Sequence, residues 1–225
     1  MGSPYIVTVC TANICRSPAA ASLLRRGLAE ALPQAVITSA GTAAISGRPA
    51  CDLSSALVGG YVATSYPTMA TSGELAGHRS RRVSRHDLDL ADLVLALDRT
   101  HRAALAQLHP GRRPRTFTLR QAAAAAVVIT AALRNGSVPE GAPMMPTDPS
   151  DRFSWWVEEL DAIRAYVTGE EGRPVGALSV DAQDVPDPHV VGYQYHPMAV
   201  ELIVSAVTSL NLSVAAVMEY RTPTS

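Results

Sequence analysis

Short apolar runs that favour β structure alternate, along the first half of the chain, with longer segments whose apolar residues recur at helical spacing. The short runs predict strands at residues 5–9, 36–38, 93–97 and 116–119. The longer segments predict helices at residues 17–30, 50–62, 99–108 and 121–133, the last of them apolar all round. Strands that alternate with helices indicate an α/β fold with a parallel sheet. Right-handed crossovers place the loop after the first strand at the sheet's carboxyl edge, where such folds bind ligands.

The second half of the chain carries longer and less regular segments. Residues 134–149 are rich in proline and glycine and are predicted to form an exposed linker. Residues 152–167 have apolar side chains at helical spacing, with acidic residues on the opposite face, and predict one helix. Residues 168–187 are again rich in glycine and proline, and residues 197–219 predict a closing helix.

Composition narrows the class of protein. The 225 residues, 47% of them apolar, are enough for one domain with a sizeable core, and a formal charge of −1 provides no overall field that would attract nucleic acid. Two basic clusters, Arg81-Arg82-Arg85 and Arg112-Arg113-Arg115, have no aromatic residues between them. We therefore expect solvated faces or contacts to an acidic substrate there, and no nucleic-acid partner.

The cellular setting is predicted from apolar runs and cysteines. Residues 122–133 are too short to cross a bilayer, and Glu201, Ser205 and Asn211 interrupt the closing helix, so no membrane span is expected. The N-terminus has no charged leader followed by an apolar run, and the three cysteines follow no disulfide-framework spacing. These features predict a reducing cytoplasm.

The chemistry is predicted from the loop between the first strand and the first helix. Cys10, five further residues and Arg16 are followed by Ser17 and Pro18, which are predicted as the helix N-cap and its first residue. A tight loop at a helix N-terminus offers a phosphate several backbone N–H groups and the positive end of the helix dipole. The predicted phosphate cradle comprises Thr11, Ala12, Asn13, Ile14, Cys15, Arg16 and Ser17.

Three side chains of this loop are expected to act together. Arg16 can bind two phosphate oxygens at once, and Cys10 lies where it would attack phosphorus as a thiolate favoured by the positive helix start. Ser17 can donate its hydroxyl to that thiolate, and Asn13 tolerates the left-handed backbone that the loop requires. Cys10 alone is more simply a buried strand cysteine; its combination with Arg16, Ser17 and Pro18 favours a nucleophile.

Residues 9–18 resemble the signature of the low-molecular-weight protein tyrosine phosphatases. Residues 39–42, 78–81, 91–98 and 187–188 resemble further motifs of this family, and residues 117–120 resemble bacterial members. The resemblance implies a three-layer, doubly wound sheet of four parallel strands flanked by helices. It also implies that phosphotyrosine is hydrolysed through a phosphocysteine, with Asp187 as general acid and then base. It implies that His78 orders the loop through Asn13 or Ser17, and that Asp98 supports it.

Some assignments stay open on the residues alone. Asp187 precedes Pro188 as in an ordinary turn, and Asp181 and Asp184 stand nearby as other candidate acids. Cys15 can form a reversible disulfide with Cys10 that protects it from overoxidation. No metal or cofactor is expected, because Cys10 and Cys15 lack a second ligand pair, and Cys51 is expected to be a core residue.

The chain also departs from the family pattern. It is expected to be a single domain, residues 1–225, with insertions at about 52–77 and 121–184, the second containing the inserted helical segment. His189 and Val190 follow Asp187-Pro188 where aromatic residues usually wall the substrate ring, and Tyr193 or Tyr195 is a candidate replacement. Ala12 and Ala21 replace a glycine and a glutamate without loss of the loop.

Several functions compete on this pattern. Phosphotyrosine is favoured over phosphoarginine, because related phosphoarginine enzymes carry threonine at the position of Ile14. Arsenate reduction requires resolving cysteines, and none follows Cys51. A small-molecule phosphatase and a non-catalytic phosphate-binding module remain alternatives, although Cys10, Arg16 and Asp187 argue against the second. The sequence does not indicate an oligomeric state.

Overall fold

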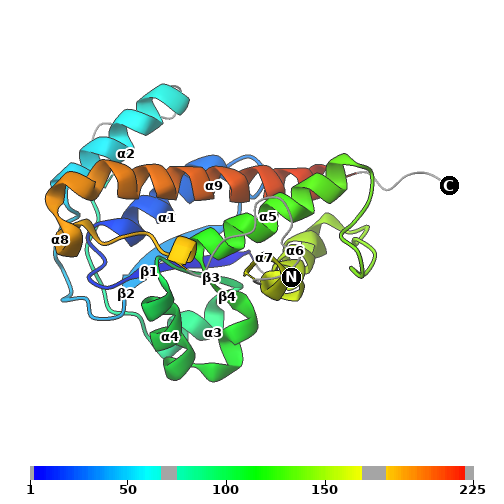
Figure 1. The fold of residues 1–225 in the computed structure, drawn as a ribbon, viewed down its shortest axis with the longest axis horizontal. Helices are drawn as coiled ribbons and strands as arrows, with labels where there is room; N and C mark the ends of the chain where they lie inside the picture. Colours follow the sequence, from blue (N-terminus) through cyan, green and yellow to red (C-terminus); the bar gives the residue numbers. More distant parts are fainter. Residues whose placement is uncertain (1–2, 67–74, 169–180, 221–225) are drawn as a thin grey trace.

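The computed structural model describes residues 3–66, 75–168 and 181–220 and has a parallel four-stranded sheet at its centre (Figure 1). The strand order is β2-β1-β3-β4, and every neighbouring pair is parallel. The strands are β1 (Tyr5–Cys10), β2 (Val36–Gly41), β3 (Leu93–Ala96) and β4 (Thr116–Thr118). All four predicted strands are confirmed, since their apolar runs are buried between helical layers.

Helices cover both faces of the sheet, which confirms the three-layer α/β fold (Figure 1). Alternate residues of β1 point to opposite faces: Ile6 and Cys10 belong to one core cluster, and Val7 and Val9 to the other. The larger core lies under α1 (Arg16–Gly27), α5 (Leu119–Arg134) and α9 (His196–Glu219). The smaller core lies under α3 (Arg85–Leu90) and α4 (Arg99–Leu108).

The start of α1 differs from the prediction. Cys15 is the N-cap residue and the helix begins at Arg16, so Ser17 lies inside the first turn. The predicted cap was wrong because the Ser17 hydroxyl contacts Cys10, Asn13 and Ala40 instead of the helix's own N–H groups. Pro18 is still tolerated, since backbone N–H groups of the first turn have no partner inside the helix.

The inserted segments add helices around this sheet. Helix α2 (Asp52–Ser65) contacts α1 and α9, and residues 67–74 of the first insertion lie outside the described chain. The one helix predicted at 152–167 is wrong, because the chain turns at Ile163 between α6 (Pro149–Ala162) and α7 (Arg164–Thr168). The turn brings the Arg164 guanidinium to 4.1 Å from the centre of the Phe117 ring in β4.

Short elements complete the described chain. They are η2 (Pro110–Arg115), η3 (Asp181–Gln183), α8 (Pro188–Val191) and η4 (Tyr193–Tyr195). Residues 134–149 are mostly exposed, as predicted for a linker, with Pro139 and Met145 buried. The predicted loop 168–187 falls largely on residues 169–180, outside the described chain.

The closing helix is confirmed as α9, which begins one residue earlier than predicted. By length and composition alone, residues Tyr193–Glu219 are apolar enough to cross a membrane, in spite of the polar residues expected to exclude this. The helix lies along α1 and α5 (Figure 1), and Ser213 on its buried side accepts a 3.0 Å hydrogen bond from Trp156. A core helix of a globular fold passes the same test, so the apolar pattern is weak support for a span.

Candidate active site

The loop predicted to cradle phosphate connects the end of β1 to the start of α1. Cys10 is the last residue of β1, only 3% exposed, and Arg16 is the first residue of α1. The Asn13 N–H lies 3.3 Å from Cys10 Sγ, so the loop folds back over the thiol. Asn13 has a φ of 54°, the left-handed conformation expected for it.

Side chains behind the loop hold Asn13 in place. Its Nδ2 donates to Ser17 Oγ at 3.0 Å and to Ser39 Oγ at 2.9 Å, while its Oδ1 accepts from the Arg81 N–H at 2.9 Å. His78 Nε2 lies 2.6 Å from the Asn13 carbonyl oxygen, which is the contact expected for this histidine. The carbonyl can only accept, so Nε2 carries the proton.

Burial lowers the pKa of His78, against the opposing effect of its hydrogen bond to Asn13. The neutral ring is therefore favoured in the folded chain, and this contribution to stability is fully present above the ordinary histidine pKa. It is lost as the pH falls through the lower pKa of the folded state.

Ser17 contacts the proposed nucleophile directly. Its Oγ lies 3.0 Å from Cys10 Sγ and 3.2 Å from the Ala40 carbonyl oxygen, and both contacts are buried. Since Asn13 already donates to this oxygen, the hydroxyl proton is available to the sulfur or to the carbonyl.

Arg16 links the loop to two segments that are distant in sequence. Its Nη1 donates to Asp98 Oδ2 at 3.1 Å and to the Val185 carbonyl oxygen at 2.9 Å, and its Nη2 donates to Asp187 Oδ2 at 2.6 Å. Its Nε–H and one Nη2–H have no partner among the described residues. These two donors are the ones that can grip a phosphate.

Asp98 is the N-cap of α4 and receives a dense set of hydrogen bonds. Its Oδ1 accepts from the Thr100 hydroxyl at 2.6 Å and from the His101 N–H at 2.8 Å. Burial alone would raise the pKa of Asp98, but hydrogen bonds from His101 and Thr100 outweigh it and hold that pKa well below its usual range. Asp98 is therefore ionised at neutral pH, where it pairs with the Arg16 guanidinium.

His101 extends this network to the front of the loop. Its Nδ1 lies 3.0 Å from Asp98 Oδ1 and its Nε2 lies 2.8 Å from the Thr11 hydroxyl. Sequence reasoning missed His101, as it missed Ser39 and the Val185 carbonyl. An Asp at a helix start with a histidine three residues on is a local signal for the first contact; nothing local indicates the contact to Thr11.

The three candidate acids occupy different environments. Asp187 contacts Arg16, and its Oδ1 also accepts from the His189 N–H and caps α8. Asp184 forms an ion pair with Arg99 at 3.0 Å instead. The side chain of Asp181 lies outside the described chain. Of the two described candidates, only Asp187 reaches the phosphate loop.

Comparison with known proteins identifies the family and supports the fold. Residues 5–127 match the family model described as low molecular weight phosphotyrosine protein phosphatase, more than half of the chain. The chain belongs to this family. It is accordingly a cysteine-based phosphoric monoester hydrolase of the low molecular weight phosphatase type, and phosphotyrosine hydrolysis is supported at the level of the family.

Individual relatives cover the same region. A protein-arginine-phosphatase of Geobacillus stearothermophilus is 34% identical over 119 residues, which cover 52% of this chain and 71% of that protein. A probable low molecular weight protein-tyrosine-phosphatase EpsP of Ralstonia nicotianae is 35% identical over 115 residues, covering 51% and 69%. The solved structure of Vibrio vulnificus Wzb in complex with benzylphosphonate superposes with a TM-score of 0.56 at 20% identity, covering 93% of this chain and 98% of that chain, and supports the fold alone.

In this phosphatase the region after Asp187 contains no phenyl wall of the expected kind. Val190 is 81% exposed, and His189 lies edge-on to Tyr193, with ring centres 5.2 Å apart. His189 also lies edge-on to His196 at 5.0 Å. Tyr193 packs on these two histidines. The replacement of the wall by Tyr193 or Tyr195 stays a prediction.

The remaining cysteines of the phosphatase form a separate group. Cys51 is not a core residue as expected: it is half-buried at the N-cap of α2, and its Sγ lies 3.4 Å from His196 Nε2. Burial raises the pKa of the Cys15 thiol to about 12, so it is protonated at neutral pH. Cys10, Cys15 and Cys51 are all free thiols, and the predicted Cys10–Cys15 redox pair stays a prediction.

Gly41, at the end of β2, provides a test of the loop's position. A Cβ there would lie 2.5 Å from the Thr11 carbonyl oxygen and 2.9 Å from the Asn13 nitrogen, both of them loop backbone. We expect Gly41→Ala to lower the free energy of unfolding by about 1–3 kcal/mol. It should also lower kcat/KM for an aryl phosphate by roughly 10²-fold, because the loop must shift.

The matched control is Gly59→Ala in α2, where an added Cβ meets nothing within 4 Å. A helical alanine should stabilise that position by up to about 1 kcal/mol and leave turnover unchanged. Urea unfolding and steady-state kinetics measure both effects. Equal kinetics for the two variants would contradict the close packing of β2 on the loop.

Proposed function

We propose that this protein hydrolyses phosphotyrosine through a phosphocysteine formed on Cys10. The observation that carries the proposal is the convergence on one loop of the Cys10 thiol, the Ser17 hydroxyl 3.0 Å from it, and the free donors of Arg16. Backbone N–H groups of residues 11–17 and the Arg16 fork bind the phosphate oxygens. Their hydrogen bonds strengthen as charge develops on those oxygens.

In the first step the Cys10 thiolate attacks phosphorus, and the bond between phosphorus and the tyrosyl oxygen breaks. Asp187 gives its proton to the departing oxygen, so the phenol leaves neutral. The ion pair of Asp187 with Arg16 supports this assignment, since it puts the carboxyl beside the bound phosphate. Asp98 acts behind Arg16, and its ionised carboxylate keeps the guanidinium turned toward the loop.

In the second step water attacks the phosphocysteine and gives its proton to Asp187, now the general base. The phosphorus–sulfur bond breaks, inorganic phosphate leaves, and Cys10 returns as a thiolate. Ser17 stabilises that leaving thiolate through its hydroxyl. His78 and Asn13 act through the loop's shape: His78 contacts the Asn13 carbonyl oxygen, and the Asn13 side chain contacts Ser17, Ser39 and the Arg81 N–H.

Phosphoarginine is the second candidate substrate. The Geobacillus stearothermophilus relative is named a protein-arginine-phosphatase, so similarity at this level does not separate the two chemistries. Ile14, half-buried in the phosphate loop, favours phosphotyrosine, because the resemblance associates threonine at that position with phosphoarginine.

A turnover panel tests the proposal with the full chain. Phosphotyrosine peptides, phosphoarginine, sugar phosphates and arsenate are each supplied, and phosphate release or arsenite formation is measured. We expect kcat/KM to be highest for phosphotyrosine peptides. A preference for phosphoarginine or a sugar phosphate would change the proposed substrate but leave the proposed cysteine-based hydrolysis in place. Phosphate binding without turnover of any ester would favour the non-catalytic module.

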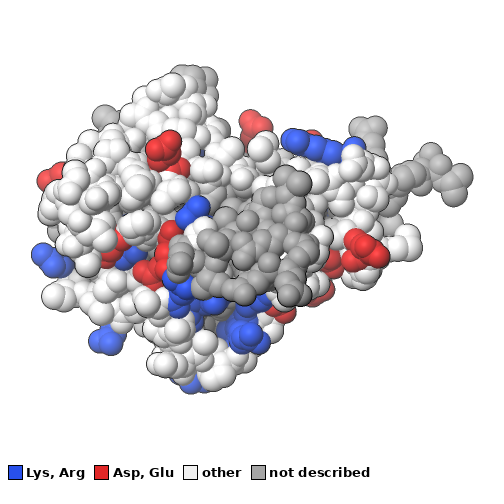
Figure 2. All heavy atoms as spheres, viewed as in Figure 1, with Lys and Arg blue, Asp and Glu red and all other residues white. Residues whose placement is uncertain are grey.

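Arginine side chains gather over the lower part of the face in Figure 2, where α4 lies in Figure 1. Arg99, Arg102, Arg113 and Arg164 line a cavity of about 350 Å³. Arg99 directly follows Asp98, whose carboxylate pairs with Arg16 of the phosphate loop. The charge supports substrates with acidic groups beside the phosphoester, in line with the expected role of the basic clusters.

The organisation and setting of the chain are further parts of the proposal. Residues 1–225 form one domain with insertions at about 52–77 and 121–184, and the described helices of these insertions pack on the sheet's helical layer. The packing of α2 and α9 on α1 supports this. The enzyme acts in the cytoplasm and has no membrane span. The burial of one side of α9 supports the second of these statements.

A further inference from the structure

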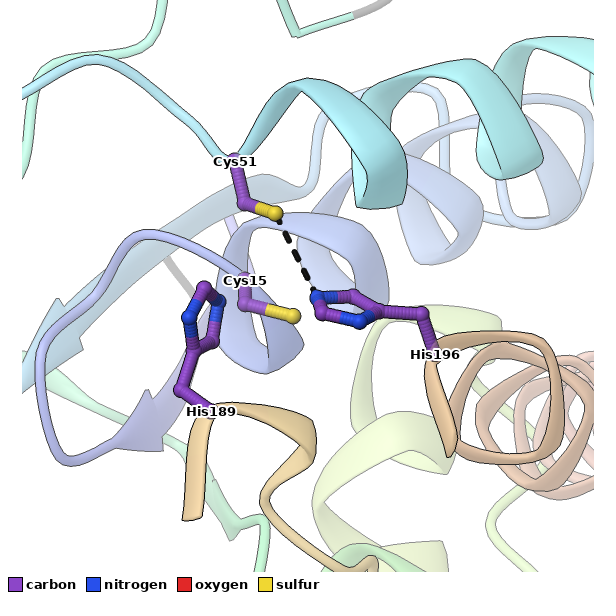
Figure 3. A group of neighbouring side chains, drawn as sticks. All are labelled: Cys15, Cys51, His189 and His196. Carbon is purple, nitrogen blue, oxygen red and sulfur yellow. Dashed lines mark hydrogen bonds between the residues drawn. The ribbon is translucent and has the colours of Figure 1, made fainter. Parts of the chain in front are cut away.

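Four side chains beside the phosphate loop converge on one point (Figure 3). Cys15 and Cys51 are the N-cap residues of α1 and α2, His189 belongs to α8, and His196 begins α9. Their sulfur and imidazole nitrogen atoms all lie within 4.8 Å of one another. None of the reaction steps above uses these four side chains.

The donor set and its spacing fit a tetrahedral soft ion. Two thiolates and two imidazoles are the ligands of many structural zinc sites, with zinc–sulfur distances of about 2.3 Å and zinc–nitrogen distances of about 2.0 Å. Ligand atoms around such an ion lie roughly 3.3–3.8 Å apart. Cys51 Sγ and His196 Nε2 already lie 3.4 Å apart, and since no pair of ligand atoms is more than 4.8 Å apart, the others need to close by at most about 1.5 Å.

Surrounding contacts prepare these ligands. His196 Nδ1 lies 2.8 Å from the Tyr193 carbonyl oxygen, so Nδ1 carries the proton and Nε2 offers its lone pair toward Cys51. The Cys51 N–H donates to the Ile14 carbonyl oxygen at 2.6 Å, and the Ser54 hydroxyl donates to the Cys15 carbonyl oxygen at 3.4 Å. These bonds hold the starts of α1 and α2 together independently of any ion.

We propose that Cys15, Cys51, His189 and His196 bind one zinc ion and thereby hold the segment carrying Asp187 over the phosphate loop. Each cysteine loses its proton to solvent on binding, so two protons are released and the four-ligand site is neutral. The ion connects the residue before Arg16 to the residue two after Asp187. Two of its ligands also lie where the chain departs from the family pattern: His189 replaces an expected aromatic residue, and Cys51 directly precedes the first insertion.

The sequence did not indicate this site, because its ligands come from four separate elements. Local motif spacing finds zinc sites whose ligands lie in close pairs, and only the fold brings residue 15 near residues 51, 189 and 196. The site is also distinct from the nucleophile, since Cys10 is not among the converging residues.

Zinc titration of the reduced, full-length protein against a chromophoric chelator tests the proposal. We expect one ion per chain in the unaltered protein and in Cys10→Ser, which removes the competing reactive thiol. Cys51→Ser and His189→Ala should weaken binding by at least ~10²-fold, because even loss of a residue that supports a ligand costs 10–100-fold. His189 is exposed, so its variant should fold.

The matched control is His86→Ala, which removes an exposed histidine of α3 outside the cluster and should leave binding unchanged. Cobalt substitution adds a spectroscopic readout, a thiolate-to-metal absorption that Cys51→Ser should weaken, because Cys15 is then the one thiolate ligand left. Zinc should also slow amide hydrogen exchange of residues 187–192. The proposal is overturned if the reduced protein fails to bind zinc, or if binding is lost in Cys10→Ser but kept in Cys51→Ser. It is also overturned if Cys15 and Cys51 form a stable disulfide and the reduced protein has no zinc affinity.

Discussion

Cys10→Ser should lower kcat for an aryl phosphate by roughly 10⁴-fold or more, the scale expected when an enzyme loses its nucleophile. A serine hydroxyl at the end of β1 has the shape of the thiol but is not ionised at neutral pH. The hydrogen bonds of Asn13 and Ser17 around it can be kept, so the loop should retain its fold. Steady-state kinetics on p-nitrophenyl phosphate measure the loss.

Phosphate binding separates loss of the nucleophile from loss of the loop. Cys10→Ser should bind inorganic phosphate within about threefold of the unaltered protein, since the backbone donors and Arg16 are unchanged. Arg16→Ala is the contrasting variant: it should lose both binding and turnover, because it removes the charged fork and leaves Asp98 without its partner. Turnover by Cys10→Ser above ~1% of the original would exclude Cys10 as the nucleophile.

Much of the fold could be predicted because its signals are local. Each strand is a short apolar run buried between two helical layers, and β3 is fully buried, so periodicity located all four. The single helix predicted at 152–167 was wrong because the spacing of apolar residues does not reveal where the chain changes direction. Ile163 fits the apolar pattern, but its backbone ends α6, and Arg164 turns to Phe117.

The candidate site likewise has a part that could be predicted from local sequence and a part that could not. The contiguous loop from Cys10 to Ser17 could be read from adjacent residues, including the left-handed Asn13. His78, Asp98 and Asp187 were reached through the resemblance, because 65 to 171 residues separate them from the loop groups that they contact. The thiol of Cys51 was misassigned to the core, since its histidine partner is 145 residues away and no short-range pattern connects them.

Asp187→Asn should lower kcat/KM for phenyl phosphate, which reports the steps up to release of the phenol, by about 10²–10⁴-fold, the contribution of general acid catalysis. The loss should be much smaller for p-nitrophenyl phosphate, whose leaving oxygen needs little protonation. Asparagine is as good an N-cap as aspartate, so α8 should be preserved. Phosphate affinity should be equal or higher, because the amide releases the Arg16 donor that Asp187 engages at 2.6 Å.

The control is Asp184→Asn, the same chemical change three residues earlier, on a carboxylate that pairs with Arg99 and not with Arg16. It should slow both substrates equally or not at all, because Asp184 does not face the leaving group. The ratio of kcat/KM values for the two substrates therefore distinguishes proton donation from disturbance of the segment. If Asp187→Asn lowers kcat/KM for both substrates by the same factor, Asp187 serves to position Arg16. Another group then protonates the departing oxygen.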